Sequence, residues 1–343
     1  MKSQDVYQPA VPDPVVRFNK LLYFFLPLLL LIFLTSCATL HQNYNKDDLL
    51  VYIADSEETI IRRHLPFFIV ENPKEKHNLI GTPVAADTGN SKEEVFVSHE
   101  TPTLYGETRS FTGEKDSYTN VIYLVHFEKF RFSLRPFYLS YGKNVGLIVV
   151  VTLNSSEVPV LYTTVHTCGC YLAFIPTSHL AQGAYPQNWD TEHQTVYGEN
   201  LPGLLDIKGT SLSETITAIV IRNNTHRIKN IYLASEEALM NYQTAAADIQ
   251  PLDSLQKIAL GSKGGTSFYE ESDQLNGYVR GSHKPWEKLL ISWWAIDGKV
   301  GRDKKLGKTI EDGPKFYTSL KPWARSESDM RVFSTFLKYW GWN

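Results

Sequence analysis

A nearly unbroken apolar stretch at residues 145–153 constrains the fold more than any other feature of this sequence. It is rich in valine, leucine and isoleucine and shows no polar alternation, which is typical of a strand buried on both faces. The Asn-Ser-Ser-Glu tetrapeptide at 154–157 suits a turn into a second apolar strand at 158–167. The sequence therefore predicts a hairpin at the centre of a sheet.

Other segments predict the elements around this hairpin. A second hairpin is expected from residues 215–221 and 228–234, which turn through Asn223 and Asn224. Shorter strands are expected at 95–97, 122–127 and 130–134, while 177–210 reads as irregular. Helices are expected over 48–64, stopped by Pro66, and from a Ser235 cap to about residue 247.

These signals predict an α+β fold with a mainly antiparallel central sheet, over roughly residues 66–234, and flanking helices. The chain has 343 residues, 43% of them hydrophobic, which is enough to build a proper core. We expect residues 47–280 to form one α+β body. The net charge of −3 argues against a nucleic-acid partner, and three cysteines exclude a disulfide-stapled scaffold.

Residues 281–343 differ in composition from this body. They hold twelve Lys and Arg against seven Asp and Glu, whereas residues 37–280 hold nineteen against twenty-eight. Six of the seven tryptophans also lie in this C-terminal region. It is predicted to be helical, with one helix from Pro285 to a stop at Gly298 and a last helix that begins near Ser326 and Asp329.

The first of these two helices is apolar nearly all round, so it must be buried in protein or lie at a membrane interface. Tryptophan favours membrane interfaces, and basic side chains are attracted to anionic head groups. The region is therefore either packed on the body, completing its core, or a contact surface for a membrane or a partner. The candidate surface residues are Trp293, Trp294, Lys299, Arg302, Lys304 and Lys305.

One constellation carries chemistry, the hexapeptide His166-Thr167-Cys168-Gly169-Cys170-Tyr171 at the end of the central hairpin. On a regular strand, His166, Cys168 and Cys170 would share a face. Three interpretations stay open: a strained and reducible disulfide, a zinc or copper site, or two inert buried thiols. A metal would need a fourth ligand, for which the candidates are His126, His179 and His193.

The N-terminus combines Arg17 and Lys20, an apolar run over residues 21–34, and the sequence Leu34-Thr35-Ser36-Cys37. The run is short for a membrane span, and the charge before it is typical of an export signal. The four residues at its end resemble the lipobox of bacterial lipoproteins. An uncleaved anchor with an incidental cysteine is the alternative.

The resemblance implies that residues 1–36 are a signal peptide that is cut off before Cys37. It also implies that this cysteine carries a diacylglycerol and an acyl chain, and that residues 37–46 form a tether. Ala38 in place of Asp after the lipidated cysteine implies delivery to the outer membrane, facing the periplasm.

We therefore expect a membrane-anchored envelope lipoprotein with a non-catalytic binding, scaffolding or assembly role. Its expected partner is the membrane, and another envelope protein is a further candidate partner. The alternative is a metal-binding or thiol-redox protein that acts through His166, Cys168 and Cys170.

Overall fold

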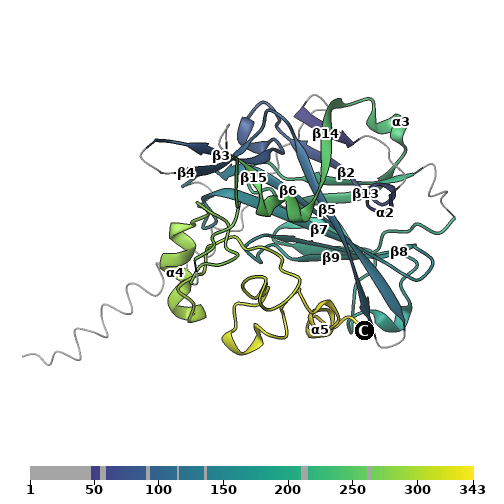
Figure 1. Cartoon of the computed structure of the whole chain (residues 1–343). Helices are drawn as coiled ribbons and strands as arrows, with labels where there is room; N and C mark the ends of the chain where they lie inside the picture. The colour runs from purple at the N-terminus through teal and green to yellow at the C-terminus, as the bar shows by residue number, and fades with distance from the viewer. Residues whose placement is uncertain are drawn as a thin grey trace, which may run out of the picture.

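The computed structural model describes residues 48–54, 59–89, 93–113, 116–134, 137–209, 215–260, 264–272 and 274–343. The predicted signal peptide, Cys37 and the tether lie outside these residues. Strands are the commonest regular structure in the described chain, and ten of them form one sheet (Figure 1). In spatial order these are β13 (Ile228–Ala234), β12 (Ile216–Ile221), β2 (Phe67–Glu71), β1 (Leu49–Ala54), β14 (Gln243–Pro251), β5 (Thr103–Thr112), β6 (Ser117–Phe130), β7 (Gly142–Leu153), β8 (Pro159–His166) and β9 (Ala173–Pro176).

The predicted mainly antiparallel central sheet with flanking helices is wrong. The sheet is mixed and nearly closed, and β14 lies in its middle, parallel to both β1 and β5. Strand β12 also runs parallel to β2. These pairings join segments far apart in the sequence, so local propensity could not reveal them.

Smaller elements complete the fold. Three two-stranded ribbons are formed by β3 (Thr82–Asp87) with β4 (Glu93–Ser98), β10 (His193–Val196) with β11 (Glu199–Pro202), and β15 (Ile258–Ala259) with β16 (Gly265–Thr266). The described helices are α2 (Ile60–Arg63), α3 (Glu236–Leu239), α4 (Pro285–Ala295) and α5 (Phe333–Tyr339), with 3-10 turns η2 (Lys76–Asn78), η3 (Gln182–Ala184), η4 (Leu252–Gln256) and η5 (Pro322–Ala324).

The ribbon β10–β11 contacts both edges of the large sheet. In β10, the Gln194 side chain donates a hydrogen bond of 2.6 Å to the carbonyl of Phe174 in β9. In β11, the buried carboxylate of Glu199 pairs with Arg227, just before β13, at 2.8 Å. The ribbon therefore links the two edge strands of the curled sheet.

Two hairpins confirm the sequence prediction. Strand β7 is buried at every position from Asn144 to Leu153 and pairs with β8 across the predicted turn. Strands β12 and β13 pair antiparallel as expected. Both hairpins are local in sequence, so their strand signals and turn residues were sufficient to identify them.

Several predicted elements are wrong. The C-terminal region, which the structure describes throughout, is not mainly helical, because only α4, the single turn η5 and α5 are helical in it, and α5 begins at Phe333 and not near Ser326. The helix over 48–64 is strand β1 followed by the single turn α2, because the Leu49–Ala54 stretch pairs with β2 and β14. The helix from Ser235 ends at Leu239, and an alanine-rich strand, β14, follows from Gln243. Residues 131–133 continue no strand after β6.

The sheet packs on both faces. One face holds a core that includes Phe68, Tyr123 and Phe127. The other face of β5–β9 is covered by the chain that follows β14, which buries Phe268, Phe316 and Phe336 against it. Alternate residues of β7 contribute to the two cores, which explains why this strand has no polar side.

Candidate functional site

The connection between β8 and β9, residues 167–172, contains both described cysteines, and we call it the thiol loop. It is a tight turn, in which the Gly169 amide donates to the His166 carbonyl at 2.7 Å and the His166 amide donates to the Cys170 carbonyl at 2.9 Å. Gly169 has a φ of +89°. A Cβ at this position would lie 2.3 Å from the carbonyl oxygen of Tyr317. Glycine is therefore required between the two cysteines.

The turn brings the two thiols together. Cys168 and Cys170 are both free thiols, the first buried and the second half-buried. The thiol of Cys170 donates a hydrogen bond to Cys168. The extended geometry that would have kept the sulfurs apart is absent here, because the chain reverses at Gly169.

The hydrogen bond makes the two thiols unequal. Burial by itself would raise the pKa of Cys168, but the hydrogen bond from Cys170 and the nearby Lys284 ammonium together hold it below its usual range. The same hydrogen bond, together with burial, raises the pKa of Cys170 well above its usual range. Cys168 is therefore the sulfur that ionises first, and Cys170 keeps its proton.

Lys304 lies beside the thiol loop. The sequence predicts this lysine to be part of an exposed basic surface. Its amide donates to the Thr167 carbonyl at 2.8 Å, and its side chain is only 2% exposed. Its Nζ lies 3.4 Å from the ring centroid of Tyr317 and has no hydrogen-bond partner among the described residues. Burial lowers the pKa of Lys304 to about 8.

Lys284, Glu287 and Asp303 complete the surroundings of the thiol loop. Lys284 and Asp303 form a buried ion pair of 3.1 Å, and the Thr167 hydroxyl donates to the Asp303 carboxylate at 2.6 Å. The buried Glu287 carboxylate accepts a hydrogen bond from Ser140.

Sequence reasoning missed these three residues. One signal was present, because Glu287 is the only carboxylate in the apolar α4 segment. Nothing in the local pattern marked Lys284 or Asp303, which reach the thiol loop only through the fold.

His166, the last residue of β8, packs against Tyr171 of the thiol loop. Its ring packs edge-on against Tyr171, with centroids 4.7 Å apart, and burial lowers its pKa to about 3. Among the described residues, no three His, Cys, Asp or Glu side chains are arranged so that they could hold a metal ion. His126 is buried against Phe268, and His193 is exposed beside Asp190. Lysines therefore lie beside the thiol loop, at positions where a metal site would need further metal ligands.

Helix α4 presents an apolar face to solvent. Leu289 is 64% exposed and Trp293 is 73% exposed, while Trp294 and Leu290 are also exposed. Ile296, the residue that ends the helix, is 75% exposed and adopts a left-handed conformation (φ 52°, ψ 47°). The side that faces the protein carries the buried Glu287. Figure 1 shows α4 at the side of the molecule, away from α5.

The predicted basic surface is not assembled as one patch. Lys305 pairs with Asp312, and the Lys299 ammonium lies 5.4 Å from the ring centroid of Tyr278. Arg302 is half-buried, and Lys304 is in the interior. The structure thus leaves Trp293 and Trp294 exposed, whereas the four basic residues grouped with them are half-buried or buried.

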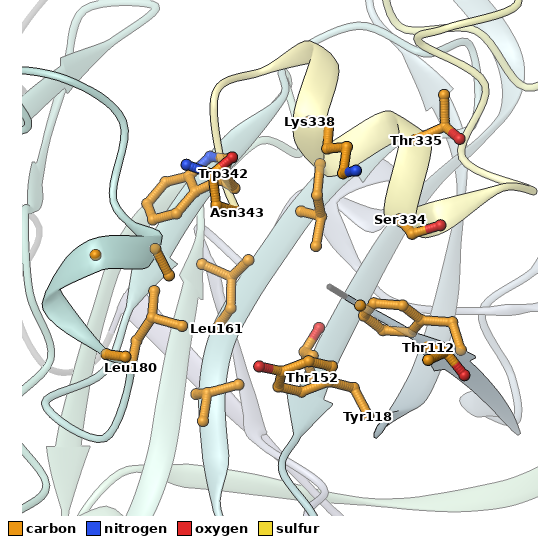
Figure 2. Close-up of a pocket in the computed structure, with 17 residues that line it drawn as sticks. Thr112, Tyr118, Thr152, Leu161, Leu180, Ser334, Thr335, Lys338, Trp342 and Asn343 are labelled. Atoms are coloured by element: carbon orange, nitrogen blue, oxygen red, sulfur yellow. The ribbon is translucent and has the colours of Figure 1, made fainter. Parts of the chain in front are cut away.

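A pocket of about 220 Å³ lies under α5 (Figure 2). Ser334 and Lys338 on α5 face Tyr118, Thr152 and Leu161 on the sheet, and most of the other lining side chains are apolar. It lies near the start of β8, whereas the thiol loop follows the end of that strand.

No protein-family model, curated protein or solved structure matches this chain. Within the part of the chain that the structure describes, no helix has both the length and the apolar character needed to cross a membrane. Function must therefore be argued from the residues themselves.

Proposed function

We propose that this chain is a lipid-anchored protein of the bacterial envelope with a non-catalytic binding role, and that the outer face of α4 rests on the lipid surface. The observation that carries the proposal is the orientation of α4. A helix whose apolar residues had only a structural role would turn them inward, yet α4 exposes Leu289 and Trp293 and buries Glu287.

The chemistry of this face favours lipid. Tryptophan is enriched at membrane–water interfaces, where its ring is apolar and its N–H remains hydrated. The exposed charge on α4 is a cation, Lys288, and its one carboxylate points inward. Such a face suits anionic head groups. It lies on an 11-residue helix that resembles, in exposure, an interfacial helix rather than a core helix.

The backbone at the end of α4 supports the same reading. Ile296 is β-branched and left-handed, a conformation that costs about 1–2 kcal/mol and that usually falls to glycine. Its side chain makes little use of the protein core, since three quarters of it is exposed. Strain at an exposed apolar residue is explained if that side chain contacts something outside the chain.

The predicted anchor makes this contact geometrically possible. About ten residues separate Cys37 from the first described residue, Asp48. An extended tether of this length spans at most roughly 35 Å. A lipidated Cys37 would therefore keep the folded domain close to the membrane surface, where several acyl chains make the attachment stable.

The test is flotation of a chain that begins at Ala38 on vesicles containing anionic lipid. We expect it to bind, and we expect Trp293→Ser with Trp294→Ser to weaken binding at least about tenfold, because burying one large apolar side chain is worth about 1.5–3 kcal/mol. Met240→Ser is the matched control, since Met240 is also exposed but ends α3, on the opposite side of the molecule (Figure 1).

Equal flotation of the double variant and the control would refute the role of α4. The anchor is read separately in cells, by incorporation of a labelled fatty acid into the full chain and its loss in Cys37→Ser. The two readouts are independent, so the anchor and the α4 contact can fail one at a time.

A further inference from the structure

The inner side of α4 closes over a polar interior that membrane contact does not use. The first turn of α4 contains Glu287. Lys284, which immediately precedes the helix, pairs with Asp303 beside Thr167. At its other end, Asp297 accepts a hydrogen bond from Tyr317, whose ring lies under Lys304. The thiol loop is thus bordered by the residues that hold both ends of α4.

We propose that the thiol loop is a thiol–disulfide exchange site that takes a low-molecular-weight disulfide as its substrate. Cys168 is the attacking sulfur, Cys170 is the resolving sulfur, and Lys304 is a positioning residue that stabilises the thiolate. The proposal goes beyond membrane attachment and does not depend on it.

The first argument is the contact between the two sulfurs. Cysteines that are two residues apart on a strand lie too far apart to bridge easily. Here the turn at Gly169, required by its φ and by the Tyr317 carbonyl, places one thiol in hydrogen-bonding contact with the other. A disulfide can therefore form without unfolding β8 or β9.

The second argument is the set of charges around the thiols. Inert buried cysteines pack as small apolar side chains. This pair instead has two lysines and the carboxylates of Glu287 and Asp303 near it. Lys284 is paired with Asp303, whereas the Lys304 ammonium lacks a hydrogen-bond partner among the described residues. Its Nζ is 3.8 Å from the position that a Cβ of Gly169, the residue between the two cysteines in the sequence, would occupy. A buried cation placed there stabilises a thiolate.

The size of the substrate follows from exposure. Cys168 is 8% exposed, and Cys170 is the more open of the two. A short, flexible disulfide reaches such a sulfur more easily than a disulfide held inside a folded protein.

The reaction balances with the disulfide RSSR as the oxidant. The Cys168 thiolate attacks one sulfur of RSSR, whose S–S bond breaks, giving the mixed disulfide Cys168–S–SR and RS⁻. Cys170 then loses its proton, its thiolate attacks the Cys168 sulfur, and the second RS⁻ leaves. The two cysteines lose two electrons, RSSR becomes two thiols RSH, and the protons released by Cys168 and Cys170 end on them.

The experiment uses the full chain in detergent, reduced and then exposed to oxidised glutathione, with the products located by peptide mass mapping. We expect the unaltered chain to finish with a Cys168–Cys170 disulfide and no retained glutathione. Cys170→Ser should retain glutathione on Cys168, because the resolving thiol is missing. Cys168→Ser should retain little on Cys170.

A mixed disulfide that accumulates in Cys168→Ser and not in Cys170→Ser would overturn the assignment of roles. The absence of any reaction in all three proteins, at a concentration of glutathione that oxidises free cysteine, would overturn the site itself. Peptide mapping also separates Cys37 from these two thiols.

Lys304 is tested by its effect on rate and on pH dependence. Lys304→Met should slow disulfide formation, and it should move the pH–rate profile to higher pH, because the loss of a nearby cation disfavours the thiolate. Lys304→Arg should recover part of the rate. Lys305→Met is the matched control, since the neighbouring Lys305 pairs with Asp312. An equal effect of Lys304→Met and Lys305→Met would remove Lys304 from the mechanism.

Discussion

Helices α4 and α5 lie in the same basic, tryptophan-rich region, but α5 buries its large apolar side chains and α4 exposes them. Helix α5 buries Phe333 and Phe336 against the sheet. Helix α4 buries Glu287 and exposes Trp293. Composition therefore does not decide whether such a helix is part of the core, and the available sheet surface does.

The difference has a physical origin in what each helix lies upon. Beneath α5 is the apolar outer face of the sheet, with Phe174 among its side chains. Beneath α4 is the thiol loop with its ion pair and its free thiols, which requires polar partners such as Glu287 and Lys284. An apolar helix placed over a polar interior has only its outer face left for its tryptophans.

The largest expected effect compares the two helices directly. Phe336→Ala should lower the free energy of unfolding by about 3–5 kcal/mol, because it leaves a cavity at a fully buried position. Trp293→Ala should change it by less than about 0.5 kcal/mol, because the ring is largely in solvent. Urea unfolding followed by circular dichroism measures both. Similar losses for the two variants would mean that α4 is a core helix.

The second prediction concerns the core that α5 helps to form on the outer face of the sheet. His126 on strand β6 packs against the Phe268 ring, with ring centroids 4.9 Å apart, and burial lowers the pKa of His126 to about 3. Because this value is below that of the unfolded chain, the neutral ring stabilises the fold above about pH 6.5, and the contribution is lost as the pH falls toward 3.

Urea unfolding between pH 7 and pH 4 should therefore show a loss that includes up to about 1.4 kcal/mol per pH unit from this residue. His126→Phe should remove that part of the slope, whereas His193→Gln, at an exposed position, should leave the slope unchanged. A slope that His126→Phe does not reduce would show that the ring is protonated in the folded protein.

The smallest expected effect is at Ile296, where one substitution should change the stability of the fold and the binding of α4 to lipid in opposite directions. Ile296→Gly should raise the free energy of unfolding by about 0.5–1 kcal/mol, since glycine accepts the left-handed conformation. The same variant should float less well on anionic vesicles, because it loses an exposed apolar side chain. A variant that is more stable and binds equally well would exclude Ile296 from the contact surface.

Two hairpins of the fold were accessible from local patterns, whereas the fold class was not, and the failures have a common cause. The hairpins β7–β8 and β12–β13 were predicted because each is closed by a short turn. Strand β14 was mistaken for a helix because it is alanine-rich and because both of its neighbours, β1 and β5, lie far from it in the sequence. Tertiary pairing overrode helix propensity there.

The candidate site divides in the same way. The spacing of His166, Cys168 and Cys170 was visible in the sequence, as were the tryptophans of α4. Lys304 was visible too, but it was interpreted as part of a surface, because a basic loop is usually solvated. Only the packing of residues 299–305 against the thiol loop shows that this lysine is buried, and that Lys284 and Asp303 belong with it.

The sequence by itself determined the central buried strand, the local hairpins, the close pair of cysteines and the amphipathic pattern of α5. These features depend on residues near one another in the chain, where periodicity and turn chemistry are sufficient. The tertiary structure alone decided the parallel pairing of β14, the outward face of α4 and the lysines beside the thiols. Each of these depends on which part of the folded chain a segment packs against. That packing determines whether a side chain is buried or exposed and which charges lie beside it.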